Sequence, residues 1–214
     1  MKPVDNIQKR YPATIRFWHW ANSFIICGSL LTVLLNSTLF DVRDNATYIQ
    51  GELAKSNVAI TTEQARSVAH SLEDKVWDIH IYFGYALAAL FLYRMISEIF
   101  RAKKTNFGTI LKESWALYFT KKVKSSRHDL GIKLAYVMFY VVLFLMVITG
   151  LSIAFDTELG LTKSFSHSLK EIHGFCMYLI LGFIVLHIGG VFMAERKDKK
   201  GIVSDMIGGG NLNE

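Results

Sequence analysis

The apolar residues of this chain are gathered into four long runs separated by polar segments. These runs are residues 17–40, 76–100, 131–155 and 172–194. Each reaches the roughly 20 residues that an α-helix needs to cross about 30 Å of hydrocarbon at 1.5 Å per residue. A soluble domain would spread its apolar residues more evenly along the chain. The pattern predicts an all-α fold, an integral membrane four-helix bundle.

The ends of the runs set the limits of the predicted helices. Pro12 suits the first turn of a helix, so the first helix is expected to begin before its apolar run does. Ser71 followed by Asp74 is a plausible cap for the second helix. We expect one membrane domain with spans at about 13–40, 76–100, 131–155 and 169–194. The main segments outside the spans are 41–75 and 156–171, both expected on the outer side, and 101–129 and 195–214.

Two of these segments carry further patterns. Within 101–129, large apolar residues recur at helical spacing among lysines, which predicts a short amphipathic helix on the membrane surface. These residues are Phe107, Ile110, Leu111, Trp115 and Tyr118. The segment 195–214 is charged and then rich in glycine, which predicts a solvated tail with little packed core.

The net charge of +6 is distributed unevenly between the segments. Residues 1–16 carry four basic residues against one acid, and 101–129 carry eight against two, whereas 41–75 hold six acids and four bases. This segregation indicates membrane orientation rather than nucleic-acid binding. We expect a bacterial inner-membrane protein in contact with lipid, with both termini and the middle loop in the cytoplasm and 41–75 outside.

Two other readings of the apolar runs are weaker. A signal peptide would have a shorter apolar core than the first run, which also contains His19 and Asn22 and lacks a small-x-small cleavage site. Cys27 and Cys176 lie in apolar runs at different expected depths, so we expect no disulfide between them. The sequence has no CxxCH, which excludes covalent c-type haem attachment.

Four histidines lie in or at the start of the apolar runs, where ionisable residues are costly and usually functional. They are His19, His80, His173 and His187. His173 and His187 are fourteen residues apart, which returns them to nearly the same helix face about 21 Å apart along the axis. One helix therefore offers a possible ligand in each leaflet.

The depths of these histidines suggest two pairs. His19 and His187 lie near the cytoplasmic ends of their helices, and His80 and His173 lie near the outer ends. Low-spin haem iron in a b-type cytochrome takes two axial ligands, for which neutral imidazole is suitable. We therefore predict two haem b groups, one held by each pair.

Other roles for these histidines stay open at this point. An interfacial position would account for His19, and a polar contact between helices would account for His80. A zinc site is less favoured, because the four histidines are not expected to converge on one point and no cysteine joins them.

Several neighbouring residues are candidates for haem contacts. Gly84, one turn after His80, and Gly174 would let a flat macrocycle approach the backbone, although small-residue helix packing explains them equally well. Arg16 and Arg94 lie near the cytoplasmic ends of their helices and could pair with haem propionates. Snorkelling to the lipid surface is the alternative for both, and Glu98 is placed to pair with Arg94 at i+4.

His128 opens the third helix on the cytoplasmic side and is a candidate contact for a quinone headgroup or a propionate. A solvated interfacial histidine is the more ordinary reading.

These motifs together resemble one known family over nearly the whole chain: the prokaryotic cytochrome b561 family, in particular the b-type cytochrome subunit of membrane-bound nickel-iron hydrogenases. The motifs are Arg16-Phe17-Trp18-His19-Trp20, Ile79-His80 followed by Arg94, Thr149-Gly150-Leu151, Ile172-His173-Gly174 through Leu186-His187, and Gly201 to Gly208 with Met206. The resemblance implies that the same four histidines are haem ligands.

In such complexes the cytochrome takes electrons from an iron-sulfur subunit outside the membrane and delivers them to quinone. The first hypothesis is therefore an electron-transfer subunit between a hydrogenase-like oxidoreductase and quinone, so the chain need not be an enzyme by itself. The second is a stand-alone quinone-linked oxidase or reductase acting on a small substrate such as superoxide, which the acidic outer segments disfavour. The third is a haem-free membrane anchor or proton carrier.

Overall fold

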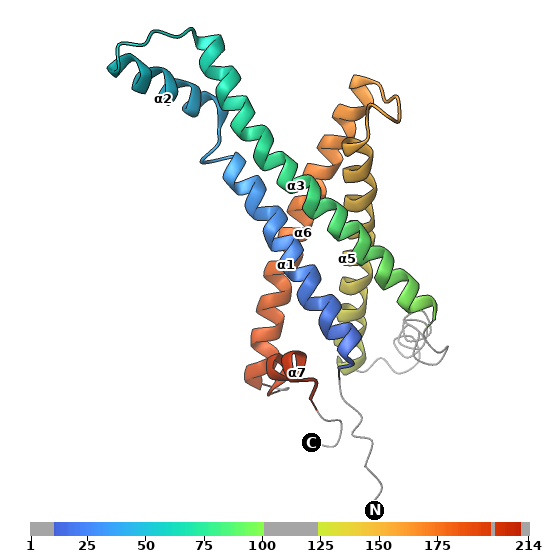
Figure 1. Cartoon of the computed structure of the whole chain (residues 1–214). Coiled ribbons are helices and arrows are strands. Elements are labelled where there is room, and N and C mark those ends of the chain that lie inside the picture. Colours follow the sequence, from blue (N-terminus) through green and yellow to red (C-terminus); the bar gives the residue numbers. More distant parts are fainter. Residues whose placement is uncertain (1–10, 101–123, 198–199, 211–214) are drawn as a thin grey trace, which may run out of the picture. The chain divides into compact units, whose positions relative to one another are not determined.

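The computed structural model describes residues 11–100, 124–197 and 200–210, and this part of the chain is helical and contains no strand. The helices are α1 (Ala13–Asn36), α2 (Val42–Lys55), α3 (Thr62–Ile99), α5 (Lys124–Ala154), α6 (Lys163–Lys197) and α7 (Ile202–Gly208) (Figure 1). The predicted surface helix around Phe107, Ile110, Leu111, Trp115 and Tyr118 lies outside the described residues.

Four of these helices are long and apolar enough to cross a membrane. They are α1, α3, α6 and the part of α5 from Gly131 to Ala154. This confirms the predicted all-α class with four spanning helices. The helix α1 begins directly after Pro12, whose carbonyl accepts hydrogen bonds from the backbone N–H groups of Ile15 and Arg16, each at 3.1 Å. Proline in this place loses nothing, because the first N–H groups of a helix have no partner within the helix.

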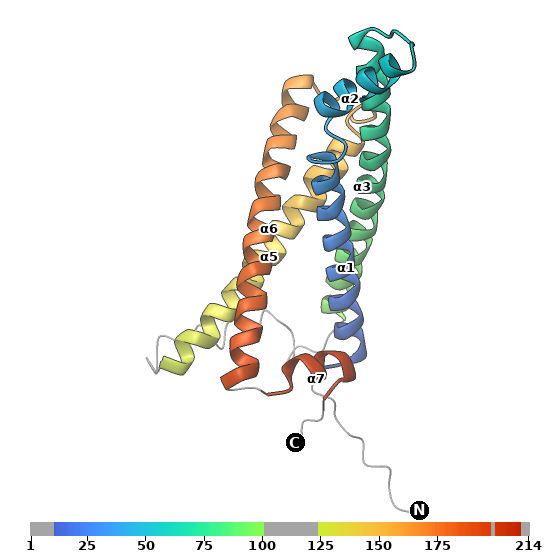
Figure 2. The same cartoon turned by 90° about the vertical axis from the view of Figure 1, so that its left-hand side faces the viewer.

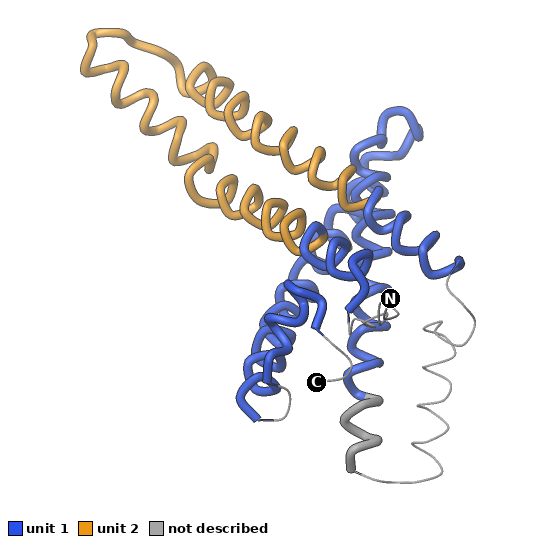
Figure 3. Tube along the Cα trace, turned by 60° about the horizontal axis from the view of Figure 1, so that its bottom comes forward, with its two compact units in different colours: residues 1–21, 89–214 blue, residues 22–88 orange. Residues whose placement is uncertain are grey.

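The chain forms two compact units (Figure 3). Unit 1 contains residues 1–21 and 89–214, and therefore the start of α1, the end of α3 and all of α5, α6 and α7. Unit 2 contains residues 22–88, which are the rest of α1, all of α2 and most of α3.

Unit 1 is built on an antiparallel hairpin of α5 and α6 (Figures 1 and 2). Phe139 of α5 stacks on Phe183 of α6 with ring centroids 4.5 Å apart. The buried residues beside this pair are Val142 and Leu143 of α5 and Cys176 and Ile180 of α6. The two helices therefore hold each other by apolar packing along their facing sides.

The C-terminal tail is docked against the start of α1 in unit 1, so the prediction of a solvated extension is wrong (Figure 2). Arg16 donates a hydrogen bond to the carbonyl of Ile207, and Trp20 Nε1 donates to the carbonyl of Met206 at 3.2 Å. The expectation of little packed core holds, since α7 contains no buried residue. Hydrogen bonds to the last carbonyls of a short helix, rather than apolar burial, attach this tail.

The first turn of α7 is held from the other side by Glu195, near the end of α6. One carboxylate oxygen of Glu195 accepts a hydrogen bond from the backbone N–H of Gly201 at 2.7 Å, and the other accepts from Val203 at 3.3 Å. Because a carboxylate stabilises the unpaired N–H groups at a helix start, α7 is capped by α6 and by α1 at its two ends.

The segment 41–75 of unit 2 folds as a helical hairpin of α2 and the first part of α3. Asp41 caps α2 by accepting hydrogen bonds from the backbone N–H groups of Arg43 and Asp44, at 2.9 and 3.2 Å. The small core between the two helices consists of Ala46, Ala65 and Ala69, with Val42, Ile49 and Ile60 packed against it. Alanines at the contact let the two helix backbones approach closely.

The start of α3 differs from the predicted one. Thr61 and Gln64 form a reciprocal capping box: Gln64 accepts from the Thr61 N–H at 2.9 Å, and the Thr61 hydroxyl accepts from the Gln64 N–H at 3.2 Å. Ser71, predicted as the cap, lies inside the helix and donates its hydroxyl to the carbonyl of Ser67 at 3.0 Å. The helix therefore starts well before the apolar run at Val76.

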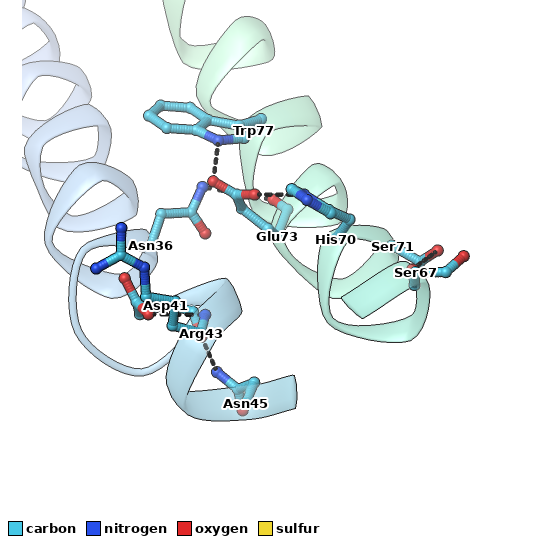
Figure 4. A network of polar contacts seen from close by, with 9 residues as sticks. All are labelled: Asn36, Asp41, Arg43, Asn45, Ser67, His70, Ser71, Glu73 and Trp77. Atoms are coloured by element: carbon cyan, nitrogen blue, oxygen red, sulfur yellow. Dashed lines mark hydrogen bonds and ion pairs between the residues drawn. The ribbon is translucent and has the colours of Figure 1, made fainter. Parts of the chain in front are cut away.

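A polar network around Glu73 connects the end of α1 with α3 (Figure 4). The carboxylate of Glu73 lies 3.2 Å from His70 Nδ1 and accepts a hydrogen bond from Trp77 Nε1 at 3.2 Å. Its backbone carbonyl accepts a hydrogen bond from the Asn36 side chain at 3.4 Å. His70 is thereby engaged with a carboxylate of its own helix.

The alanine core gives a test of the α2–α3 hairpin. The side chain of Ala65 is fully buried, so Ala65→Leu should overpack the contact and destabilise the hairpin by about 1–3 kcal/mol. Hydrogen exchange of the detergent-purified protein should then show lost protection of the α2 amides. Ala54→Leu, at an exposed position of α2, is the matched control and should leave protection unchanged. Equal protection in both variants would contradict the alanine core.

Candidate functional site

Two of the four predicted histidines face each other within unit 1. His19 of α1 and His187 of α6 have ring centroids 6.2 Å apart, with the ring planes tilted by 50°. Both rings are half-buried. They lie at the end of unit 1 where α7 joins α1 and α6. The structure thus brings together the pair that the sequence assigned to one depth.

Aromatic rings surround this pair. His187 stacks on Phe183, with centroids 5.7 Å apart and planes 10° apart, and His19 meets Trp20 edge to face at 5.1 Å. Nδ1 of His19 is buried and has no hydrogen-bond partner among the described residues. An unsatisfied buried nitrogen costs about 1–3 kcal/mol, so the imidazole is suited to a partner that the polypeptide does not supply.

The separation of the rings fits two imidazoles bound to one metal ion. Metal–nitrogen bonds of about 2 Å on opposite sides of the ion would put the two ring centroids roughly 6 Å apart. The observed 6.2 Å agrees with that value. The donor set of two neutral imidazoles is also the one that a bis-histidine haem requires.

His80 lies in unit 2 and is oriented by hydroxyl groups of α1. Its Nδ1 lies 2.9 Å from Thr32 Oγ1 and 3.3 Å from Ser29 Oγ. Its ring meets that of Trp77 edge to face at 5.4 Å, and Trp77 is in turn bound by Glu73. Near the same contact, a Cβ at Gly28 would lie 2.5 Å from the ring of Phe83, so only glycine fits against α3 here.

His173 lies in unit 1 and is oriented in a similar way by α5. Its Nδ1 lies 2.9 Å from Thr149 Oγ1. A Cβ at the adjacent Gly150 would lie 3.1 Å from Cε1 of His173, which is closer than an ordinary van der Waals contact. The dipeptide Thr149-Gly150 therefore offers both a hydroxyl and the space for the ring.

The two arginines have protein partners. Arg94 Nε donates a hydrogen bond to the Tyr140 hydroxyl at 3.1 Å, and its Nη2 lies 3.4 Å from the Glu98 carboxylate, the i+4 pair expected from the sequence. Its guanidinium also lies over the ring of Trp18, 5.7 Å from the centroid. Arg16 binds the carbonyl of Ile207, and its Nε is buried without a hydrogen-bond partner in the described part of the chain.

Gly84 and His128, the remaining predicted contacts, lie in α3 and α5. Gly84 lies in α3, and no described atom of its unit lies within 4 Å of a Cβ built on it, so the surface beside it is open to a flat group. His128 lies in the first turns of α5. The residues that the sequence did not single out as histidine partners are Thr32, Ser29 and Thr149, since only packing between helices reveals those contacts.

A hollow of about 260 Å³ lies beside the α5–α6 connection of unit 1. Its charged lining residues are Asp156, Lys163, His167 and Lys170. His167 Nε2 lies 3.6 Å from the carboxylate of Glu171. Two lysines and one aspartate line this hollow, and Glu171 lies beside it, so positive and negative charges are mixed there.

Four helices apolar enough to span a membrane, with His19 and His187 facing each other in unit 1, are typical of membrane b-type cytochromes. The family model described as prokaryotic cytochrome b561 matches residues 10–209, and the chain belongs to this family. Comparison with curated proteins and with solved structures gives no significant match. The chain is therefore a multi-pass membrane b-type cytochrome with a role in electron transfer, and the family implies that it binds haem b.

The contact between Gly150 and His173 can be tested directly. Gly150→Ala should push the imidazole away by a few tenths of an ångström and weaken its bond to Thr149, because the added Cβ would lie 3.1 Å from the ring. Disturbed orientation of a metal-binding histidine typically costs about 10–100-fold in affinity, so the purified variant should retain less haem. The haem-to-protein ratio and the reduced-minus-oxidised spectrum measure this loss.

The control for this variant is Gly131→Ala on the same helix. A Cβ there has no described atom within 4 Å, so haem content should be unchanged. Full haem content with an unaltered spectrum in Gly150→Ala would show that the close contact is not required.

Proposed function

We propose that this chain is a di-haem cytochrome b subunit that transfers electrons between an outward-facing, hydrogenase-like oxidoreductase and quinone. His19 and His187 hold one haem, and His80 and His173 hold the other. The observation that carries the proposal is the 6.2 Å separation of the His19 and His187 rings, which matches two axial ligands of one iron.

The second pair is supported by the sequence spacing and by the local order of each ring. His173 precedes His187 by fourteen residues on α6, which gives nearly the same helix face about 21 Å away. His80 and His173 each have Nδ1 beside a threonine hydroxyl at 2.9 Å. Two imidazoles oriented through the same nitrogen are suited to the same role.

The chain's own residues bind and orient the haems and keep water from them. Bound haem supplies reversible one-electron chemistry at its iron. Apolar and aromatic residues such as Phe183 and Trp20 exclude water around the imidazoles, and this low-polarity environment sets the haem potentials. No acid, base or nucleophile in the chain has to take part in the electron transfer.

The direction of the path follows from the charge distribution. The basic segments 1–16 and 101–129 support a topology with both termini in the cytoplasm, in which the His80 and His173 pair is on the outer side. The α2–α3 hairpin then extends on the outer side and offers a folded surface to the iron-sulfur or hydrogenase-type partner. Quinone exchanges electrons within the membrane.

Haem counting tests the ligand assignment. Purified protein should contain about two haem b per chain, and alanine in place of His19, His80, His173 or His187 should remove one haem each, because a single imidazole holds the iron weakly. Variants His19→Ala and His187→Ala should lose the same spectral component, and the other two variants the second component. His167→Ala, which changes an exposed histidine, is the control and should keep both haems. A colourless, folded wild-type protein would end the cytochrome proposal.

Electron exchange with quinone tests the function itself. Under anaerobic conditions, a menaquinol or ubiquinol analogue should reduce the haems, or the corresponding quinone should reoxidise the reduced haems, within the time of stopped-flow mixing. Absorbance of the haem α-band follows both reactions. Failure of both directions with both quinone types, in protein that dithionite reduces normally, would exclude quinone as the redox partner.

A further inference from the structure

The threonines beside His80 and His173 have the same hydrogen-bond arrangement. Thr149 Oγ1 donates a hydrogen bond to the carbonyl of Leu145 at 2.6 Å and lies 2.9 Å from His173 Nδ1. Thr32 Oγ1 donates to the carbonyl of Ser29 at 2.6 Å and lies 2.9 Å from His80 Nδ1. Both threonines are buried, and each belongs to the helix that neighbours the histidine.

The number of protons available decides the direction of these bonds. A hydroxyl has one hydrogen and two acceptor lone pairs. In each threonine that hydrogen is directed to a carbonyl of its own helix at 2.6 Å, so the oxygen meets the histidine as an acceptor. The nitrogen Nδ1 of each imidazole must therefore carry the proton. In the neutral ring, Nε2 is then the nitrogen that carries the in-plane lone pair, which is the lone pair that a metal ligand uses.

We propose that Thr32 and Thr149 are positioning residues that fix His80 and His173 in the Nδ1-protonated form and aim Nε2 at one haem iron. This inference rests on the proposed function, because it concerns the haem that this pair holds. A hydrogen bond from Nδ1–H to an acceptor also makes the imidazole a stronger base and so a stronger ligand. The two threonines thereby lower the potential of that haem.

The pair of His19 and His187 provides an internal comparison. Nδ1 of His19 has no hydrogen-bond partner among the described residues, so no described threonine plays this part at His19. Changes at Thr32 and Thr149 should therefore affect one haem and leave the other as it is. A general loosening of the membrane domain would disturb both haems.

The test replaces the hydroxyl without changing the size of the side chain. Thr149→Val should raise the midpoint potential of one of the two haems, because the ferric iron loses a strongly basic ligand. A tenfold change in the equilibrium between ferric and ferrous forms corresponds to about 59 mV for a one-electron couple. The low-spin electron paramagnetic resonance signal of the same haem should shift as well. Thr149→Ser restores the hydroxyl and should restore both readouts.

Thr32→Val should change the same haem but less strongly, because Ser29 Oγ lies 3.3 Å from His80 Nδ1 and offers a second acceptor. The double variant Ser29→Ala with Thr32→Val should shift the potential further than Thr32→Val alone but less than Thr149→Val, because the backbone carbonyl of Ser29 also accepts a hydrogen bond from His80 and is kept in both substitutions. Thr38→Val is the control: its hydroxyl donates to the Leu34 carbonyl at 2.6 Å, but it is exposed and has no histidine beside it. Both haems of Thr38→Val should be unchanged.

The outcomes separate this inference from the proposed function. If Thr149→Val loses one haem while Thr149→Ser keeps both, the result supports the positioning role. A shifted potential supports it equally. Wild-type potentials and signals in Thr149→Val would overturn it, while a wild-type content of two haems would leave the proposed function intact. Loss of haem in Thr149→Ser as severe as in Thr149→Val would also overturn it, since serine keeps the hydroxyl.

Discussion

The rest of the structure depends on one requirement: an imidazole placed between apolar helices needs a partner for its polar nitrogens. Burial of an unpaired nitrogen costs about 1–3 kcal/mol, and apolar surroundings offer no water to satisfy it. The chain meets this requirement in two ways. His173 and His80 each have one nitrogen beside a threonine hydroxyl at 2.9 Å. His19 faces the ring of His187 instead, and its Nδ1 has no partner in the described part of the protein. The haem iron that we propose between these two rings would supply the missing partner.

This requirement explains where small residues are placed in the helices. The glycine after Thr149 leaves room for His173, since a Cβ at Gly150 would lie 3.1 Å from the imidazole and push it away by a few tenths of an ångström. In unit 2, Gly28 lies one turn before Thr32 and admits the ring of Phe83, which follows His80 by three residues. In both cases a helix carrying a histidine lies close to a helix that offers glycine and a hydroxyl. The same helix packing therefore brings the two backbones close together and orients the imidazole ring.

The sequence predicted what depends on composition and helical period, and missed what depends on contacts between helices. Long apolar runs define the spanning helices because the length of hydrocarbon is fixed. Depth alone put His19 beside His187, since both lie near the ends of their runs. It could not reveal Thr149 beside His173, because the rotation of each helix about its axis is not encoded in hydropathy. The predicted start of α3 was wrong because α3 begins well before its apolar run, at a capping box formed by Thr61 and Gln64. The chain outside the spans follows local capping, which apolarity does not reveal.

The docked tail shows how such local capping can act on the site. Arg16 and Trp20, which bind the carbonyls of α7, lie within one turn of His19 on α1. Glu195, which binds the start of α7, lies about two turns after His187 on α6. The short helix is therefore bonded at one end to the helix that carries His19 and at the other to the helix that carries His187. Because these bonds join polar groups to backbone atoms, they fix distance and register more closely than apolar packing does. A segment whose helix has no buried residue thus helps to hold the rings of His19 and His187 6.2 Å apart.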